Sequence, residues 1–134
     1  MLGKMYYYPI RIKEVDLDVY AHVNNAKYLE FFEEARWDYI NQNGYGYPKI
    51  LETGFGPVVL EVTMRYLKEL RLGDSVTIET HLISYEGKIG KLSQNMVREK
   101  DVCCTSEFTI ALFDLKSRKL VAPTPEWWKG LGLH

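Results

Sequence analysis

A run of polar residues comes just before the most aromatic segment of the chain, in the stretch DLDVYAHVNNAKYLEFFEEAR (residues 16–36). Two carboxylates, Asp16 and Asp18, are followed by His22 and then by two adjacent asparagines. Carboxylates and imidazoles are side chains that take up and release protons in enzymes. The start of a helix needs only one polar capping residue. The excess of polar groups therefore indicates a second role, and acid–base chemistry is the role that these residue types suit.

Each of these residues also has an ordinary structural interpretation. Asp18 could hydrogen-bond its own backbone in a turn, and Asp16 could hold the same turn. His22 could be a loop histidine, and because no Ser or Cys lies near it in the sequence, it does not suggest a catalytic triad. Asn24 or Asn25 could cap the helix that follows. The local spacing alone leaves both interpretations of Asp18 open.

The segment that must position these residues has the pattern of a long helix. Aromatic and small residues recur at spacings of three and four from Tyr28 to Tyr39, and Gly44 is placed to end the helix. Leu29 and Trp37 widen the apolar surface beyond a single stripe. Such a helix is expected to be covered on more than one side.

Alternating apolar and polar residues predict β-strands on both sides of this helix. One strand is expected before the helix and four long ones after it, joined mainly by hairpin turns, over residues 6–16, 58–67, 75–86, 89–100 and 102–115. Residues 44–57, rich in Gly and Pro, predict a loop, and residues 123–131 predict a terminal turn or short helix. This order predicts an α+β fold: a single domain, residues 1–134, in which a curved antiparallel sheet of about five strands wraps the helix.

An open sheet of this kind has edge strands, and edge strands are commonly hidden by pairing with a second copy of the chain. We therefore expect at least a homodimer, with a homotetramer as the further assembly.

The bulk composition narrows the function classes. The 134 residues carry a net charge of -1, which gives no electrostatic reason to expect nucleic acid or a membrane surface as a partner. The adjacent Cys103 and Cys104 point to opposite faces of a predicted strand, so we expect thiols, no disulfide between them and a cytoplasmic location. No further cluster of Cys and His suggests a metal site, and we expect neither metal nor cofactor.

These features together resemble a known family. The strand, the D-x-D segment, the helix in HVNNAKYLEFFEEAR, the VV strand and the pattern Y-L-x-x-x-x-x-x-G-D-x-V-x-I-x-T are similar to the hotdog-fold acyl-CoA thioesterases, in particular the 4-hydroxybenzoyl-CoA thioesterase and YbgC-like branch. The resemblance extends from about residue 7 to residue 124. The HVNN tetrapeptide also resembles a segment of plant acyl-ACP thioesterases, in which Asn stands where this chain has Tyr20.

The resemblance implies roles for residues around the helix start. Asp18 takes the position of the catalytic carboxylate, and Asn25 that of the residue whose backbone N–H polarises the thioester carbonyl. His22 belongs to the HVNN variant and, if functional, would orient Asp18 or the acyl carbonyl. The chain departs from the family pattern after the second strand, where a common proline is missing and Lys68, Glu69 and Leu70 stand instead. That departure concerns loop contacts.

The chemistry of thioester hydrolysis explains why these groups are suitable. The N-terminus of a helix offers unpaired backbone N–H groups and a partial positive charge, and such fixed donors stabilise an oxyanion well. A thiolate leaves readily, so no strong general acid is needed. Asp18 could then act as a general base on water or as a nucleophile through a mixed anhydride. The sequence does not choose between these two roles, although we favour the general base.

Further residues are predicted to contact the substrate. Tyr20, Asn24, Tyr28 and Val59 lie in segments that carry the resemblance and are candidate substrate-binding residues, although Tyr28 is also expected in the core. Lys88 and Lys91, in the turn EGKIGK, are candidates to contact the phosphates of coenzyme A. The ordinary structural interpretation of both residues is a solvated surface charge.

Three competing functions remain open. An enoyl-thioester hydratase would resemble D-x-N-P-x-H, whereas here no proline lies between Asp18 and His22. Asp18 and the capped helix argue mildly against a non-catalytic acyl-thioester binder. An acyl-ACP thioesterase stays open because the HVNN segment resembles that class. The sequence does not specify the acyl chain.

Overall fold

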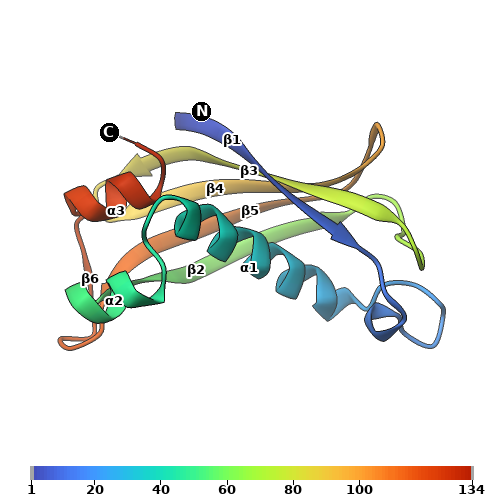
Figure 1. Ribbon diagram of the computed structural model, residues 1–134, viewed down its shortest axis with the longest axis horizontal. Helices are drawn as coiled ribbons and strands as arrows, with labels where there is room; N and C mark the ends of the chain where they lie inside the picture. Colours follow the sequence, from blue (N-terminus) through green and yellow to red (C-terminus); the bar gives the residue numbers. More distant parts are fainter. Residues whose placement is uncertain (1, 134) are drawn as a thin grey trace.

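The computed structural model describes residues 2–133 and consists of an antiparallel sheet with one long helix lying along it (Figure 1). The elements follow one another in the order β1 (Leu2–Arg11), the 3-10 helix η1 (Glu14–Asp16), α1 (Asn25–Gln42), α2 (Tyr47–Thr53), β2 (Phe55–Tyr66), β3 (Ser75–Glu86), β4 (Ile89–Arg98), β5 (Asp101–Asp114), β6 (Lys119–Val121) and α3 (Pro125–Gly130).

The sheet orders its strands β1-β3-β4-β5-β2, and the short β6 pairs with β5. All pairings are antiparallel. The strands that lie on either side of α1 in the sequence, β1 and β2, occupy the two edges of this order. This arrangement confirms the predicted hotdog fold, with six strands where about five were expected.

The helix α1 forms where the sequence pattern predicts it. Its buried residues recur at helical spacing and include Phe32, Ala35 and Tyr39, which are almost inaccessible to solvent in the core against the sheet. Asn24 is the N-cap, and its side chain accepts a hydrogen bond from the backbone of Ala26. Figure 1 shows α1 running from the loop after β1 toward α3.

Three local features differ from the sequence expectation. The strand predicted to reach residue 16 ends at Arg11, and the chain then turns through η1. The segment predicted as a loop contains α2, which has Pro48 in its first turn and ends at Gly54 in the left-handed conformation. Proline is well tolerated in the first turn of a helix and glycine just after its end, so these residues bound a short helix here. The strand β6 was also not predicted.

The two cysteines are buried and free in β5, and burial raises the pKa of the Cys104 thiol to about 12. Between residues 2 and 133, no helix is both long and apolar enough to cross a bilayer.

Candidate active site

The loop that leads into α1 is held by backbone hydrogen bonds. Asp16 is buried, and its carboxylate accepts a hydrogen bond from the Lys13 N–H at 2.8 Å, while its carbonyl accepts one from the Asn24 N–H at 2.9 Å. Leu17 and Val23 form an isolated antiparallel bridge. Hydrogen bonds therefore hold both ends of the loop 16–24 together, and residues 18–22 form a turn between these ends.

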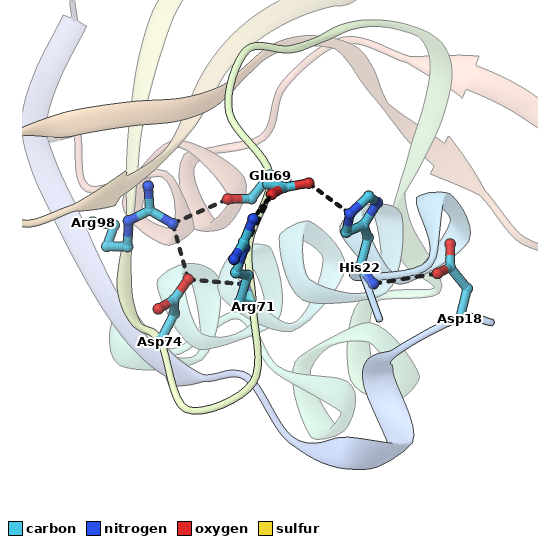
Figure 2. Close-up of polar contacts among 6 residues, drawn as sticks. All are labelled: Asp18, His22, Glu69, Arg71, Asp74 and Arg98. Atoms are coloured by element: carbon cyan, nitrogen blue, oxygen red, sulfur yellow. Dashed lines mark hydrogen bonds and ion pairs between the residues drawn. The ribbon is translucent and has the colours of Figure 1, made fainter. Parts of the chain in front are cut away.

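This turn orients Asp18. Its Oδ1 atom accepts a hydrogen bond from the backbone N–H of Tyr20 at 2.9 Å. The same atom accepts one from the backbone N–H of His22 at 3.3 Å (Figure 2). The turn closes with the Asp18 N–H donating to the His22 carbonyl at 2.8 Å, and Ala21 takes a left-handed backbone conformation. These bonds fit the turn-residue interpretation of Asp18, and they engage one carboxylate oxygen only. Among residues 2–133, no group hydrogen-bonds its Oδ2 atom.

The start of α1 exposes a backbone donor. The Asn24 side chain satisfies the Ala26 N–H at 2.9 Å, and the Asn24 carbonyl accepts from Lys27 at 2.8 Å. The Asn25 N–H, in contrast, has no hydrogen-bond acceptor within the described part of the chain. This is the orphan donor expected at a helix N-terminus.

A small crevice of about 180 Å³ opens beside this donor. Of the residues predicted to act on the substrate, it brings together His22, Asn25 and Tyr28; the remaining lining residues are Val23, Tyr66, Leu67, Lys68 and Glu69. Asp18 does not belong to this lining. The Asp18 carboxylate, which was predicted to be catalytic, therefore does not line the crevice. It is hydrogen-bonded to the backbone N–H of His22, which does line it.

Tyr28 and Tyr66 form one side of the crevice. Their rings pack edge to face with centroids 4.9 Å apart, and burial raises the pKa of the Tyr28 hydroxyl to about 12. The Tyr28 hydroxyl is therefore neutral at physiological pH.

His22 contacts a charged cluster from the loop between β2 and β3. Its Nε2 atom lies 2.6 Å from Oε2 of Glu69. Glu69 also bonds Arg71, and its backbone carbonyl accepts from Arg98, which in turn pairs with Asp74 at 2.9 Å (Figure 2). The hydrogen bond from Arg71, together with the nearby positive charges, lowers the pKa of the Glu69 carboxyl. Glu69 is therefore ionised at neutral pH.

A second, larger cavity of about 260 Å³ lies between α1 and β2. Its lining is mostly apolar and includes the predicted substrate contact Val59 together with Trp37, Ile40, Leu92, Ile110 and Trp127. Arg36 also borders it, donating to Gln94 Oε1 at 3.0 Å and stacking over the Phe108 ring. Burial lowers the pKa of the Arg36 guanidinium to about 10, so this group is still charged at neutral pH.

Other predicted residues lie apart from the crevice. Lys88 and Lys91 belong to the β3–β4 hairpin, which is at the end of the sheet near α3, opposite to the start of α1 (Figure 1). Lys91 lies 3.6 Å from a Glu107 carboxylate oxygen. Tyr20 is 76% exposed, and the Asn24 side chain is engaged as the cap.

Sequence reasoning missed two parts of this region. Glu69 was noted only as a departure from the family pattern, and its contact with His22 joins two loops far apart in the sequence. No role at a cavity was predicted for Arg36. The signal that could have found it is its position four residues after Phe32 on the buried face of the helix.

Comparison with known proteins agrees with this fold. Residues 12–130 match the thioesterase-like superfamily. The chain is 37% identical to the long-chain acyl-CoA thioesterase FadM of Escherichia coli, over 84% of this chain and 86% of that protein. It is 28% identical to the acyl-CoA thioesterase YbgC of Haemophilus influenzae, over 91% and 90% of the two chains.

Among solved structures, that of the probable thioesterase YbaW from Escherichia coli superposes with a TM-score of 0.83 at 35% identity, covering 93% of this chain and 95% of that one. The chain belongs to the thioesterase-like superfamily.

Proposed function

We propose that this chain hydrolyses acyl-CoA thioesters to a carboxylic acid and free CoA, with Asp18 and the Asn25 backbone N–H as its catalytic groups. FadM and YbgC, to which it is similar over most of its length, are named as acyl-CoA thioesterases. The observation that carries the proposal is the Asn25 N–H in the lining of the crevice, which has no acceptor among residues 2–133. The turn that holds Asp18 lies directly before it in the chain.

The proposed reaction uses one fixed donor and one carboxylate. The Asn25 N–H donates to the thioester carbonyl oxygen and stabilises the negative charge that develops there. A water molecule attacks the carbonyl carbon, and Asp18 accepts its proton through the oxygen that the turn leaves unbonded. The carbon–sulfur bond then breaks, and the thiolate of CoA takes up the proton. Attack by Asp18 itself, through a mixed anhydride, is the second route within the same geometry.

The cavity between α1 and β2 is the proposed site of the acyl chain. Asn25, Leu29 and Arg36 fall on one side of α1 by helical periodicity, so a chain attached at the Asn25 donor can run along the helix toward this cavity. The rise of an α-helix places Arg36 about 16 Å along the axis from Asn25, which suits a long acyl group. Val59 is then a substrate contact.

A second copy of the chain is proposed to complete the site. The edge strand β2 exposes several apolar residues, among them Val59, Leu60 and Val62. An exposed, long and apolar edge strand is commonly covered by another chain. Within one chain, Lys88 and Lys91 lie far from Asn25. In this proposal they contact the CoA phosphates of a site whose Asn25 belongs to the other chain. A tetramer would need a further interface.

Two competing proposals concern the substrate carrier and the reaction. The chain is also 25% identical, over 54% of its length, to an acyl-acyl carrier protein thioesterase of Arabidopsis thaliana. An acyl carrier protein is thus the second candidate carrier. A hydratase or a non-catalytic binder would use the same crevice without releasing a thiol.

The test is a panel of acyl-CoA substrates of increasing chain length, assayed by thiol release with the wild-type chain and Asp18→Asn. We expect Asp18→Asn to lower kcat at least about a hundredfold with unchanged folding, because general-base contributions are of this size. Glu14→Gln is the matched control, since it makes the same carboxylate-to-amide change at an exposed residue just before the loop.

Near-normal turnover by Asp18→Asn would overturn the role of Asp18. A 3-hydroxyacyl product would indicate the hydratase, and binding without any turnover would indicate the non-catalytic module. Turnover of acyl-ACP alone would reassign the carrier.

A further inference from the structure

The contact between His22 and Glu69 joins the loop that carries Asp18 to the loop between β2 and β3. The Nε2 atom of His22 lies 2.6 Å from Oε2 of Glu69, within ion-pair distance. Both residues line the crevice that contains the Asn25 donor. The carboxylate therefore meets the imidazole at the wall of the proposed active site rather than on a remote surface.

This contact determines which ring nitrogen faces a bound molecule. An ionised carboxylate oxygen can only accept hydrogen bonds, so a lone pair on Nε2 at 2.6 Å from it would be repelled. A neutral His22 ring in this place therefore carries its hydrogen on Nε2 and its lone pair on Nδ1. No residue within 2–133 hydrogen-bonds that Nδ1 atom. The ring is thus left with one free acceptor, fixed in direction by Glu69.

From this geometry we infer that Glu69 is a positioning residue for catalysis, which acts by holding His22 so that Nδ1 hydrogen-bonds the attacking water beside Asp18. The inference rests on the proposed thioester hydrolysis. Water that is hydrogen-bonded by two fixed acceptors is oriented for attack, and orientation of this kind raises turnover. In this proposal Glu69 acts on the attacking water only through His22.

Glu69 is well placed for this role because its loop is braced. Arg71 Nε donates to its carboxylate at 3.0 Å, and Arg98 Nη1 donates to its carbonyl at 3.0 Å. The neighbouring Leu70 is fully buried, and its carbonyl accepts from the Val23 N–H at 3.4 Å. The loop carrying Glu69 is therefore packed directly against the loop carrying His22.

The residue type at this position makes the contact possible. Glu69 lies in the segment where the family pattern commonly has a proline. A proline side chain has no group that could accept a hydrogen bond from an imidazole. The positioning of His22 by a carboxylate is thus a property of the residues of this chain.

The experiment is a double-mutant cycle on kcat with an acyl-CoA substrate that the wild-type chain hydrolyses. His22→Ala and Glu69→Ala are each expected to lower kcat about tenfold, and the double variant is expected to be no slower than His22→Ala, because interacting residues are non-additive. KM and the urea midpoint of unfolding are expected to stay unchanged. Glu69→Gln keeps an acceptor for Nε2 and is expected to recover part of kcat. Glu86→Ala, an exposed carboxylate at the end of β3, is the control.

A fall in kcat for Glu69→Ala that persists in the His22→Ala background would overturn the inference, as would a wild-type kcat for Glu69→Ala. Either result with Asp18→Asn still inactive would leave the proposed function intact. If the wild-type chain hydrolyses no acyl-CoA, the proposed function fails instead. The His22–Glu69 contact is then still measurable by nitrogen-15 NMR, in which Glu69→Ala should remove the Nε2–H tautomer preference of the His22 signal.

Discussion

The two ends of α1 differ in the groups that surround them. At the N-terminal end, Asp18, His22 and Glu69 form charged contacts in a partly exposed loop region. At the C-terminal end, contacts are buried and uncharged: the Tyr39 hydroxyl donates to the Leu131 carbonyl at 2.7 Å, and Tyr45 packs edge to face with Trp127.

This difference predicts that residues at one end of α1 contribute mainly to stability and residues at the other end mainly to turnover. The C-terminal end joins α1 to β1 and α3, where the Asn43 side chain donates to the Tyr6 hydroxyl and to the Gly130 carbonyl. Changes there should alter the free energy of unfolding. Changes at the N-terminal end should alter turnover, because its polar groups are exposed and exposed charge pairs contribute little to stability.

The largest expected effect is at the C-terminal end. Tyr45→Ala removes a fully buried ring and the hydrogen bond from its hydroxyl to the Phe55 carbonyl at 2.9 Å. We expect the free energy of unfolding to fall by about 3–5 kcal/mol, measured by urea denaturation. Tyr47→Ala, which truncates a ring that is 67% exposed, is the matched control and should change it by less than about 0.5 kcal/mol. Equal effects of the two variants would contradict the buried role of Tyr45.

An intermediate effect is expected for Asp16, which tests whether residues at the N-terminal end of α1 also contribute to stability. Asp16 is a buried carboxylate within the N-terminal region, and Asp16→Ala removes the acceptor for the Lys13 N–H. We expect a loss of about 1–2 kcal/mol in the free energy of unfolding, as for other capping residues, together with a lower kcat because the Asp18 turn loses its support. Glu14→Ala is the control in the same short helix. A stable Asp16→Ala variant with normal turnover would show that the loop is held without this carboxylate.

The smallest effect concerns a single buried hydroxyl. Tyr39→Phe keeps the ring and leaves the Leu131 carbonyl without its donor. We expect the free energy of unfolding to fall by about 1 kcal/mol, with kcat unchanged. Tyr7→Phe, whose ring is 60% exposed, should change neither quantity. A lower kcat for Tyr39→Phe would show that the two ends of α1 are coupled.

The sequence was sufficient to predict the elements that follow a regular period. The spacing of Phe32, Ala35 and Tyr39 predicted α1, and the alternating strands predicted the antiparallel sheet, because burial of one face imposes these periods. The short helix α2 was missed because its Pro48 and flanking glycines are also typical of a loop.

Contacts between loops were the least accessible to sequence reasoning. The His22–Glu69 pair depends on how the segments before α1 and after β2 meet, and no local pattern encodes that meeting. Asp18 was found through the family resemblance rather than through spacing, since a turn aspartate has the same local sequence. The relation of Lys88 to the site likewise depends on the direction of β3, which places its hairpin at the far end of the sheet.

The strand order also has a consequence for synthesis of the chain. Neither β1 nor β2 pairs with the other: β1 pairs with β3 and β2 with β5. A growing chain that has emerged only as far as β2 has no sheet on which to bury the aromatic face of α1. Because β3, β4 and β5 all follow α1 in the sequence, the aromatic face of α1 stays exposed until these strands have been synthesised. Apolar surface that is exposed during synthesis favours aggregation.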